Sequence, residues 1–338
     1  MKKVVPDGKG GVSIVDAPLP KLFENSALCR MTHSLISSGT EGKQIRESIG
    51  HVPDDPAQRP ALGYCGAGIV EEVQGTGIGI EKGDRAAYYG GPWVSHSEYV
   101  VVPGNLVLQV PEGMDMECAA FIGLGAIALH GFRMGRTGLG EICVVAGAGL
   151  LGNLCAQLAF LAGCRVIVSD PMPGRLDYLS KRDLVCVPPE NLEGAVREAS
   201  ESRGADAVLL CVSTASAEPM AQSLRIIRPG GRIVVVGVLD LHLPREDFFQ
   251  KEAEITISRA AGPGRYDMSY EKSGVDYPYQ YIRWTEGRNL KEAMRLIASG
   301  RLEVKSLISN TSPLARSAEA YQRILSGTPD LAHIISWD

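Results

Sequence analysis

The sequence predicts an α/β protein in which a parallel sheet covered by helices is combined with a β-barrel-like domain of short strands. Two changes of pattern along the chain support this: short strands between Gly/Pro turns give way to alternating strands and helices, and that alternation later ends. With 338 residues, the chain is long enough for two domains that each bury a core. We expect residues 118–262 to form one domain, and residues 1–117 and 263–338 to form the other.

The first 117 residues have the pattern of a β domain. Residues 4–5 and 12–15 flank a glycine-rich turn, as in a hairpin, and further strands are expected at 67–73 and 98–102.

The central region alternates strands with helices, which is typical of a parallel sheet. A helix rich in small residues is expected at 150–162, and a second helical segment should end at Pro229-Gly230-Gly231. Short apolar runs suited to buried parallel strands lie at 142–146, 165–169, 206–212 and 232–238.

The last 75 residues lose this alternation. A segment rich in Gly, Tyr and Arg (262–288) leads into a helix with Leu290, Ala293, Met294 and Ile297 on one face. Gly300 should end that helix, and a second short helix is expected at 317–325.

Composition excludes several classes of function. Charged residues make up 22% of the chain and the net charge is −5, without a basic block, which argues against nucleic acid as a partner. No stretch approaches the ~20 apolar residues of a membrane span, and the first residues lack the pattern of a signal peptide. None of the eight cysteines is arranged as C-x-x-C. We therefore expect a cytoplasmic protein with no membrane partner.

The motif Gly147-Ala148-Gly149-Leu150-Leu151-Gly152 predicts a dinucleotide site. It follows an expected strand and opens an expected helix, which is the context that gives this short pattern meaning. Gly147 permits a tight turn, Gly149 lets the backbone approach a pyrophosphate, and Gly152 lets helix and strand pack closely. The helix N-terminus then presents free N–H groups to the phosphates.

Asp170 ends the next strand, about 20 residues beyond the motif, where a carboxylate accepts hydrogen bonds from the ribose of NAD. This predicts NAD over NADP, although nearby Arg175 leaves NADP open. Val212 and Gly237, at the ends of two further expected strands, complete the candidate cofactor residues.

The chain as a whole resembles the medium-chain dehydrogenase/reductase superfamily. The resemblance covers nearly all of the sequence and is carried by Pro60 to Val70, Gly83-Asp84-Arg85, the glycine motif, and Arg228 to Gly231. It implies a GroES-like β-barrel domain and a Rossmann domain, with the chain returning to the first domain at its end. We also expect a homodimer or homotetramer.

The resemblance fails at the metal ligands of the zinc-dependent members. Ser38, Tyr64 and Leu124 stand where those relatives have ligands, and the stretch between Asp84 and Ser97 lacks the four cysteines of a structural zinc lobe. Zinc needs three soft or borderline side chains around an open position. We therefore expect no zinc, and reject a new site formed by Cys65 and His51.

Without zinc, a side chain must meet the substrate oxygen during hydride transfer. Thr40 matches the hydroxyl residue that relays the proton in the alcohol dehydrogenases, and Tyr64 carries a phenol at a ligand position. Glu41 and Lys43 could tune either group. A nearby cation, with Lys43 the nearest candidate in sequence, or the charge of the nicotinamide should lower the pKa of Tyr64. The alternatives are a strand-end hydroxyl for Thr40 and a pocket wall for Tyr64.

A narrower resemblance concerns the segment after residue 262. Gly262 to Asp267, Asp276-Tyr277-Pro278 and Arg283-Trp284-Thr285 are similar to zinc-free members that include the N-terminal half of bidomain oxidoreductases. Those proteins are associated with carbohydrate and cell-surface genes. We expect Arg265, Tyr277, Arg283 and Trp284 to contact a polar substrate; the alternative is a structural loop at a dimer or domain contact.

The sequence thus predicts a zinc-independent, NAD-dependent dehydrogenase or ketoreductase acting on a secondary alcohol or ketone of a sugar, cyclitol or similar molecule. Three alternatives remain. One is a quinone or enoyl reductase using NADPH, another is a redox-neutral epimerase or lyase with bound NAD, and the third is a nucleotide-sensing protein without catalysis.

Overall fold

The structure is a computed structural model that describes residues 1–241 and 245–337. It divides into two compact units, Met1–Leu124 with Pro263–Asp338, and Gly125–Gly262. The break at Leu124 lies a few residues after the expected one at 117, and the division of roles between the units stays a prediction. Helix α3 (Ile122–Gly135) contains this break.

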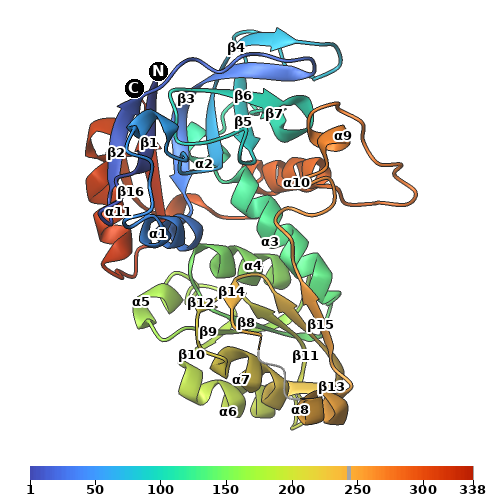
Figure 1. Ribbon diagram of the computed structural model, residues 1–338. Coiled ribbons are helices and arrows are strands. Elements are labelled where there is room, and N and C mark those ends of the chain that lie inside the picture. The colour runs from blue at the N-terminus through green and yellow to red at the C-terminus, as the bar shows by residue number, and fades with distance from the viewer. Residues whose placement is uncertain (242–244, 338) are drawn as a thin grey trace. The chain divides into compact units, whose positions relative to one another are not determined.

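A seven-stranded sheet dominates the first unit, in the order β16-β17-β3-β4-β5-β7, with β6 also paired to β3 (Figure 1). The expected hairpin is present beside it as the antiparallel pair β1 (Lys2–Pro6) and β2 (Val12–Asp16). The strands of the larger sheet are β3 (Ser26–Ile36), β4 (Cys65–Gln74), β5 (Arg85–Tyr89), β6 (Tyr99–Pro103), β7 (Val107–Gln109), β16 (Ile308–Pro313) and β17 (Ala332–Ser336).

The longest of these strands, β3, organises the sheet because it pairs with β4, β6 and β17. The sequence analysis missed it, since its buried and half-buried residues show no clean alternation. The helices of this unit are α1 (Ser38–Glu47), α2 (Met116–Ala119), α9 (Met268–Glu271), α10 (Glu286–Ala298) and α11 (Ser317–Leu325).

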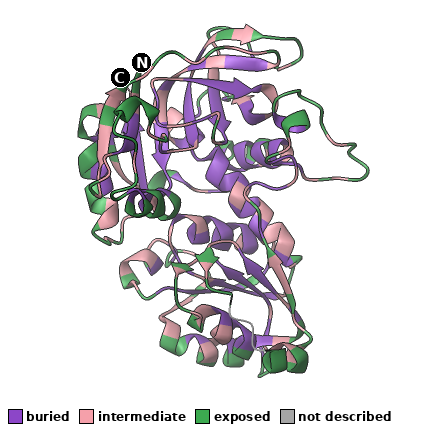
Figure 2. Cartoon of the chain, viewed as in Figure 1, coloured by how far each residue is buried: buried purple, intermediate pink, exposed green. Residues whose placement is uncertain are grey.

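The second unit is a parallel sheet of six strands in the order β10-β9-β8-β11-β13-β15. Its interior strands are buried (Figure 2), which explains why they read as continuous apolar runs. Their bounds are β8 (Ile142–Ala146), β9 (Arg165–Ser169), β10 (Val185–Val187), β11 (Ala205–Leu210), β13 (Ile227–Val235) and β15 (Glu254–Ile257).

Two short strands, β12 (Ser213–Thr214) and β14 (Val238–Leu239), pair separately beyond the ends of β11 and β13. The helices are α4 (Leu150–Leu161), α5 (Pro173–Leu176), α6 (Leu192–Ala199), α7 (Glu218–Ile226) and α8 (Arg245–Lys251). Strand order reverses at β8, and crevices at such reversals bind ligands at the carboxyl ends of the strands. The α/β fold expected from the sequence is therefore confirmed.

One local prediction was wrong. Pro229-Gly230-Gly231 does not end a helix, because α7 stops at Ile226 and these residues lie inside β13. The pairing of β13 with β11 jumps there from Ile227 to Arg232, so the intervening residues bulge out of the sheet. Gly230 has a φ of 68°, which glycine adopts without strain.

Candidate active site

The glycine motif forms the turn between β8 and α4, as the sequence predicted. Gly147 has a φ of 96°. A Cβ atom on Gly152 would lie 1.8 Å from the Gly147 carbonyl oxygen, so no larger residue fits there. A Cβ on Gly149 would meet no atom within 4 Å, which leaves its surroundings open to an incoming phosphate. Gly149 precedes Leu150 as the N-cap of α4, and Leu151 is half-buried in the first turn.

Asp170 is tied to this turn. Its Oδ2 accepts a hydrogen bond of 2.8 Å from the backbone N–H of Ala148, and its Oδ1 accepts another of 2.8 Å from Met172. The carboxylate is buried, and Arg175 Nη1 lies 3.7 Å from Oδ2. Asp170 therefore stabilises the turn between β8 and α4 in addition to any contact with a cofactor. This structural role is not apparent from the sequence.

Other groups around Asp170 fit a nucleotide. In the described part of the chain, the buried Oγ of Ser169 and Nε of Arg175 have no hydrogen-bond partner. A buried polar atom without a partner is costly, and a bound ribose or phosphate would supply one. Gly237 packs closely on Val212, since a Cβ there would lie 2.0 Å from the Val212 carbonyl oxygen. The second unit thus offers a cradle that suits a dinucleotide.

Three hydroxyl groups gather in the first unit at the start of α1. Tyr64 donates a hydrogen bond of 2.6 Å to the Oγ of Ser37, the N-cap residue of α1. Thr40, one turn along the helix, is near enough to the Tyr64 hydroxyl to lower its pKa as a hydrogen-bond partner. Thr40 is exposed, Tyr64 is half-buried and Ser37 is buried. Thr40 is therefore a helical residue and not a strand-end hydroxyl.

Glu41 lies behind these hydroxyls with no solvent exposure. Its Oε1 accepts a 2.6 Å hydrogen bond from the backbone N–H of Ser37, and its Oε2 accepts one from Tyr321 and lies 2.9 Å from Nε2 of His96. Its charge is thus matched by donors on three sides. Glu41 contacts no solvent and is suited to positioning rather than to proton transfer with a substrate.

His96 extends this network to the end of the chain. Its Nδ1 lies 2.7 Å from the Oγ of Ser34, which accepts a 2.9 Å hydrogen bond from the indole of Trp337. The imidazole of His96 thus connects Ser34 with Glu41.

Lys43 does not have the role expected for it. It lies on the exposed face of α1, with 48% of its side chain accessible, and pairs with Glu47 at 3.7 Å. The expected lowering of the Tyr64 pKa by Lys43 is also wrong, because burial raises that pKa well above its usual value and Lys43 does not act on it. The hydrogen-bonding groups of Ser37 and Thr40 oppose the shift without reversing it. Tyr64 is therefore a hydrogen-bond donor at neutral pH.

The donor set at the expected metal position does not fit zinc. Ser38 begins α1, Tyr64 is committed to Ser37, and Leu124 is a buried aliphatic residue. Among the residues that the structure describes, no group of three or more His, Cys, Asp or Glu side chains is placed to hold a metal ion. His51 is exposed and hydrogen-bonds the Ile49 carbonyl, apart from the buried Cys65.

Arg265 is a structural residue in this fold. It is buried, pairs with Glu271, donates to the carbonyl of Gly91 and stacks on Tyr266. Glu271 also accepts a 2.8 Å hydrogen bond from Trp93. These contacts favour the alternative of a structural loop for Arg265, against the expected substrate contact.

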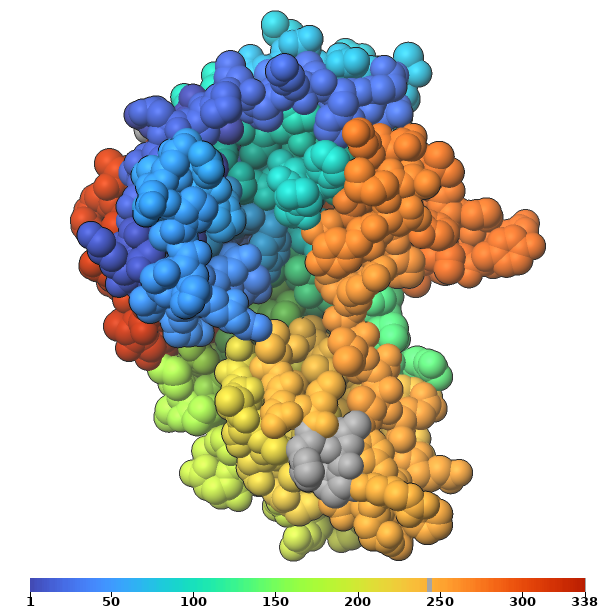
Figure 3. Space-filling model, viewed as in Figure 1, coloured from blue at the N-terminus to red at the C-terminus, as the bar shows by residue number. Residues whose placement is uncertain are grey.

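The other three expected substrate residues lie in a segment that projects from the surface after α9 (Figures 1 and 3). Tyr277 donates to Asp267 at 2.6 Å. The guanidinium of Arg283 lies 3.9 Å from the ring centroid of Trp284 and 4.6 Å from that of Tyr279. Because Arg283 and Trp284 are stacked and partly exposed, their contact with a substrate stays a prediction, as does that of Tyr277.

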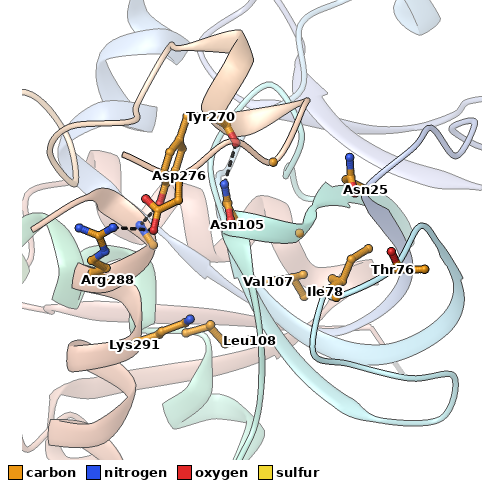
Figure 4. Close-up of a pocket in the computed structure, with 14 residues that line it drawn as sticks. Asn25, Thr76, Ile78, Asn105, Val107, Leu108, Tyr270, Asp276, Arg288 and Lys291 are labelled. Atoms are coloured by element: carbon orange, nitrogen blue, oxygen red, sulfur yellow. Dashed lines mark hydrogen bonds and ion pairs between the residues drawn. The ribbon is translucent and has the colours of Figure 1, made fainter. Parts of the chain in front are cut away.

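A cavity of about 180 Å³ lies in the same unit, and none of the predicted site residues lines it, although Tyr277 contacts the lining residues Arg288 and Tyr270 (Figure 4). Asn105 on one wall donates to the Tyr270 carbonyl, and Arg288 on another pairs with Asp276 at 2.6 Å. The predicted catalytic and cofactor residues do not line this cavity, so we assign it no role in the reaction.

The sequence analysis missed Ser37, His96 and Tyr321. Ser37 could have been noticed as an N-cap serine before a helix with Glu41 in its first turn, a pattern related to the capping box. His96 and Tyr321 are 55 and 280 residues from Glu41 along the chain, so no local pattern joins them.

Comparisons with known proteins match the chain to dehydrogenases. The family model described as zinc-binding dehydrogenase matches residues 151–273. The 2-dehydro-3-deoxy-L-galactonate 5-dehydrogenase of Pseudoalteromonas atlantica is 29% identical over 306 residues, which cover 87% of this chain and 76% of that protein.

Solved structures show the same fold. Galactitol-1-phosphate dehydrogenase from Escherichia coli superposes with a TM-score of 0.80 at 19% identity, over all of both chains. A dehydrogenase structure from Sinorhizobium meliloti 1021 bound to NADP gives 0.77 at 22% identity, over 99% of each chain.

The nucleotide cradle and the fold define a dinucleotide-dependent oxidoreductase. The family model and these relatives make the chain similar to the medium-chain dehydrogenase/reductase superfamily over most of its length. No helix in the described residues has the length and apolar character to cross a membrane.

Proposed function

We propose that this protein is an NAD-dependent dehydrogenase or ketoreductase that works without zinc on a secondary alcohol or ketone of a polar substrate such as a sugar or cyclitol. The observation that carries this proposal is the group of three hydroxyls, Ser37, Thr40 and Tyr64, at the start of α1. The resemblance matches Tyr64 to a metal-ligand position of the zinc-dependent members. The names of the relatives, which include a sugar-acid and a sugar-alcohol dehydrogenase, support the substrate class.

The cofactor would be held by the second unit. The free N–H groups at the start of α4 suit a pyrophosphate, and the open space beside Gly149 allows its approach. The Asp170 carboxylate favours the ribose hydroxyls of NAD and repels the 2′-phosphate of NADP. Arg175, 3.7 Å from it, weakens that preference. When bound, the nicotinamide supplies the site for hydride transfer.

The substrate oxygen would be met by hydroxyl donors instead of a metal ion. Negative charge develops on that oxygen during carbonyl reduction, and a donor fixed in advance stabilises it. Tyr64 remains protonated at neutral pH because burial raises its pKa. The protonated Tyr64 phenol is therefore available as a hydrogen-bond donor at neutral pH.

The test is a turnover assay of purified protein with NAD and NADP against a panel of polyols, sugar acids and their ketones, with and without a chelator. We expect turnover with NAD that survives chelation, and well under one zinc per chain by elemental analysis. Activity that is lost on chelation and restored by zinc would refute the metal-free mechanism. NAD that stays bound through purification, with no net reduction of added NAD, would instead indicate a redox-neutral epimerase or lyase.

A further inference from the structure

The Ser37 hydroxyl has a proton that it can offer to a ligand. The Ser37 Oγ accepts a hydrogen bond of 2.6 Å from the Tyr64 hydroxyl, so one of its lone pairs already has a donor within the protein. Within residues 1–241 and 245–337, the structure gives no acceptor for the Ser37 hydroxyl proton itself. The side chain is 9% exposed, so it is enclosed but not sealed.

The backbone of Ser37 is fixed by Glu41. A carboxylate is an acceptor only, and the groups that face Glu41 are all able to donate: the Ser37 N–H, the Tyr321 hydroxyl and Nε2 of His96. Because this arrangement is fully buried, it has a strong preference for one geometry. Glu41 thereby holds the N-cap of α1 in place from behind.

The hydroxyls form a continuous chain from solvent. Thr40 is exposed and near enough to the Tyr64 hydroxyl to act on its pKa, and Tyr64 donates to the buried Ser37. Each hydroxyl can accept one proton while it gives up another. A proton can therefore pass from water to Ser37 without any of the three groups holding a charge for long.

We propose that Ser37 is the hydroxyl that hydrogen-bonds and protonates the substrate oxygen, that Tyr64 and Thr40 resupply its proton, and that Glu41 is the positioning residue for Ser37. In ketone reduction, a nicotinamide cofactor held by the glycine turn and Asp170 would supply the hydride for the new C–H bond, and the carbonyl π electrons would move to oxygen. That oxygen takes the Ser37 proton, Ser37 takes the Tyr64 proton, Tyr64 takes the Thr40 proton, and Thr40 takes one from water. The inference rests on the proposed dehydrogenase function.

The experiment is a double-mutant cycle of Ser37→Ala, Tyr64→Phe and the double variant, using the best substrate of the polyol and ketone panel. Ser48→Ala is the matched control, because Ser48 is also 9% exposed, lies at the other end of α1 and bonds only the local Ile45 carbonyl. We measure kcat, KM and the affinity for NAD. A general acid typically contributes 10²–10⁴-fold in rate.

We expect Ser37→Ala and Tyr64→Phe each to lower kcat by about 10²-fold or more. The kcat of the double variant should lie within about threefold of the kcat of the less active single variant, because the effects of groups that act as one unit are not additive. NAD affinity should stay within about twofold of wild type in all of them. Ser48→Ala should keep wild-type kcat.

Glu41→Gln gives a separate readout, because its amide nitrogen would face a donor. We expect faster hydrogen exchange of the Ser37 amide and a lower kcat, with NAD affinity unchanged. Suppose that the wild type turns over the substrate. If Ser37→Ala then keeps more than half of the wild-type kcat, or if the losses from Ser37→Ala and Tyr64→Phe multiply in the double variant, this inference fails while the proposed dehydrogenase function stands. If wild type turns over no alcohol or ketone with NAD or NADP, the proposed function fails and the inference with it.

Discussion

The Asp170→Ala substitution tests the link between the nucleotide site and the stability of its unit. It removes a buried carboxylate that accepts one 2.8 Å hydrogen bond from Ala148 and one from Met172. Asn is not a conservative replacement here, because both oxygens face backbone donors and its amide would place a donor against one of them.

The expected magnitude follows from these bonds. A hydrogen bond to a charged group contributes about 1.5–3 kcal/mol, so the loss of two should lower the free energy of unfolding by about 3 kcal/mol or more. If the same carboxylate also accepts from the NAD ribose, the affinity for NAD should fall by roughly tenfold or more. NADP affinity should fall less, since a repulsion is removed as well.

Urea unfolding and calorimetric titration with NAD and NADP measure both effects. Asp177→Ala is the control, because Asp177 is an exposed carboxylate nearby, just after α5; it should change neither quantity appreciably. An Asp170→Ala protein as stable as wild type would refute the structural role. Tighter binding of NADP than of NAD by the wild type would refute the assigned selectivity.

Three further outcomes are expected. Gly152→Ala should unfold at lower temperature and lose NAD binding, because its Cβ would lie 1.8 Å from the Gly147 carbonyl oxygen. Gly149→Ala should keep its melting temperature but bind NAD more weakly, since its Cβ meets only open space that a phosphate needs; equal binding by wild type and Gly149→Ala would contradict this. Burial lowers the pKa of His130 to about 4 from 6.5, so stability is full above pH 6.5 and is lost as pH falls toward 4. His130→Gln should flatten that acid limb, which is worth about 2–3 kcal/mol in urea unfolding at pH 4.

The nucleotide part of the candidate site could be predicted because its residues are close together in the sequence. The strand, glycine turn and helix that cradle the nucleotide follow one another directly, so spacing alone located Gly147, Gly152 and Asp170. Arg265 shows the limit of the same reasoning. Its residue type suited a polar ligand, but only tertiary structure reveals Glu271 and the Gly91 carbonyl as its partners.

The hydroxyl site was predicted in part, for a geometric reason. Thr40, Glu41 and Lys43 are near neighbours in sequence, but helix α1 turns them in different directions: Glu41 is fully buried while Lys43 is exposed and pairs with Glu47. Lys43 is therefore close to Thr40 in sequence, but its ammonium group is not placed beside the Tyr64 phenol.

The raised pKa of Tyr64 makes one more prediction, about how the reaction depends on pH. Burial keeps the phenol protonated up to strongly alkaline pH, so below that range Tyr64 can pass a proton along but cannot store the one that alcohol oxidation releases. That proton must leave through the exposed Thr40 to a base in solution, and kcat for oxidation should therefore rise with pH between about 6 and 9. Ketone reduction consumes a proton that water resupplies, so its kcat should stay nearly flat over the same range. Thr40→Val interrupts the chain at its solvent end and should reduce the pH slope of oxidation while NAD affinity is kept. Parallel pH profiles for both directions would show instead that a group with an ordinary pKa, outside these three hydroxyls, takes the proton.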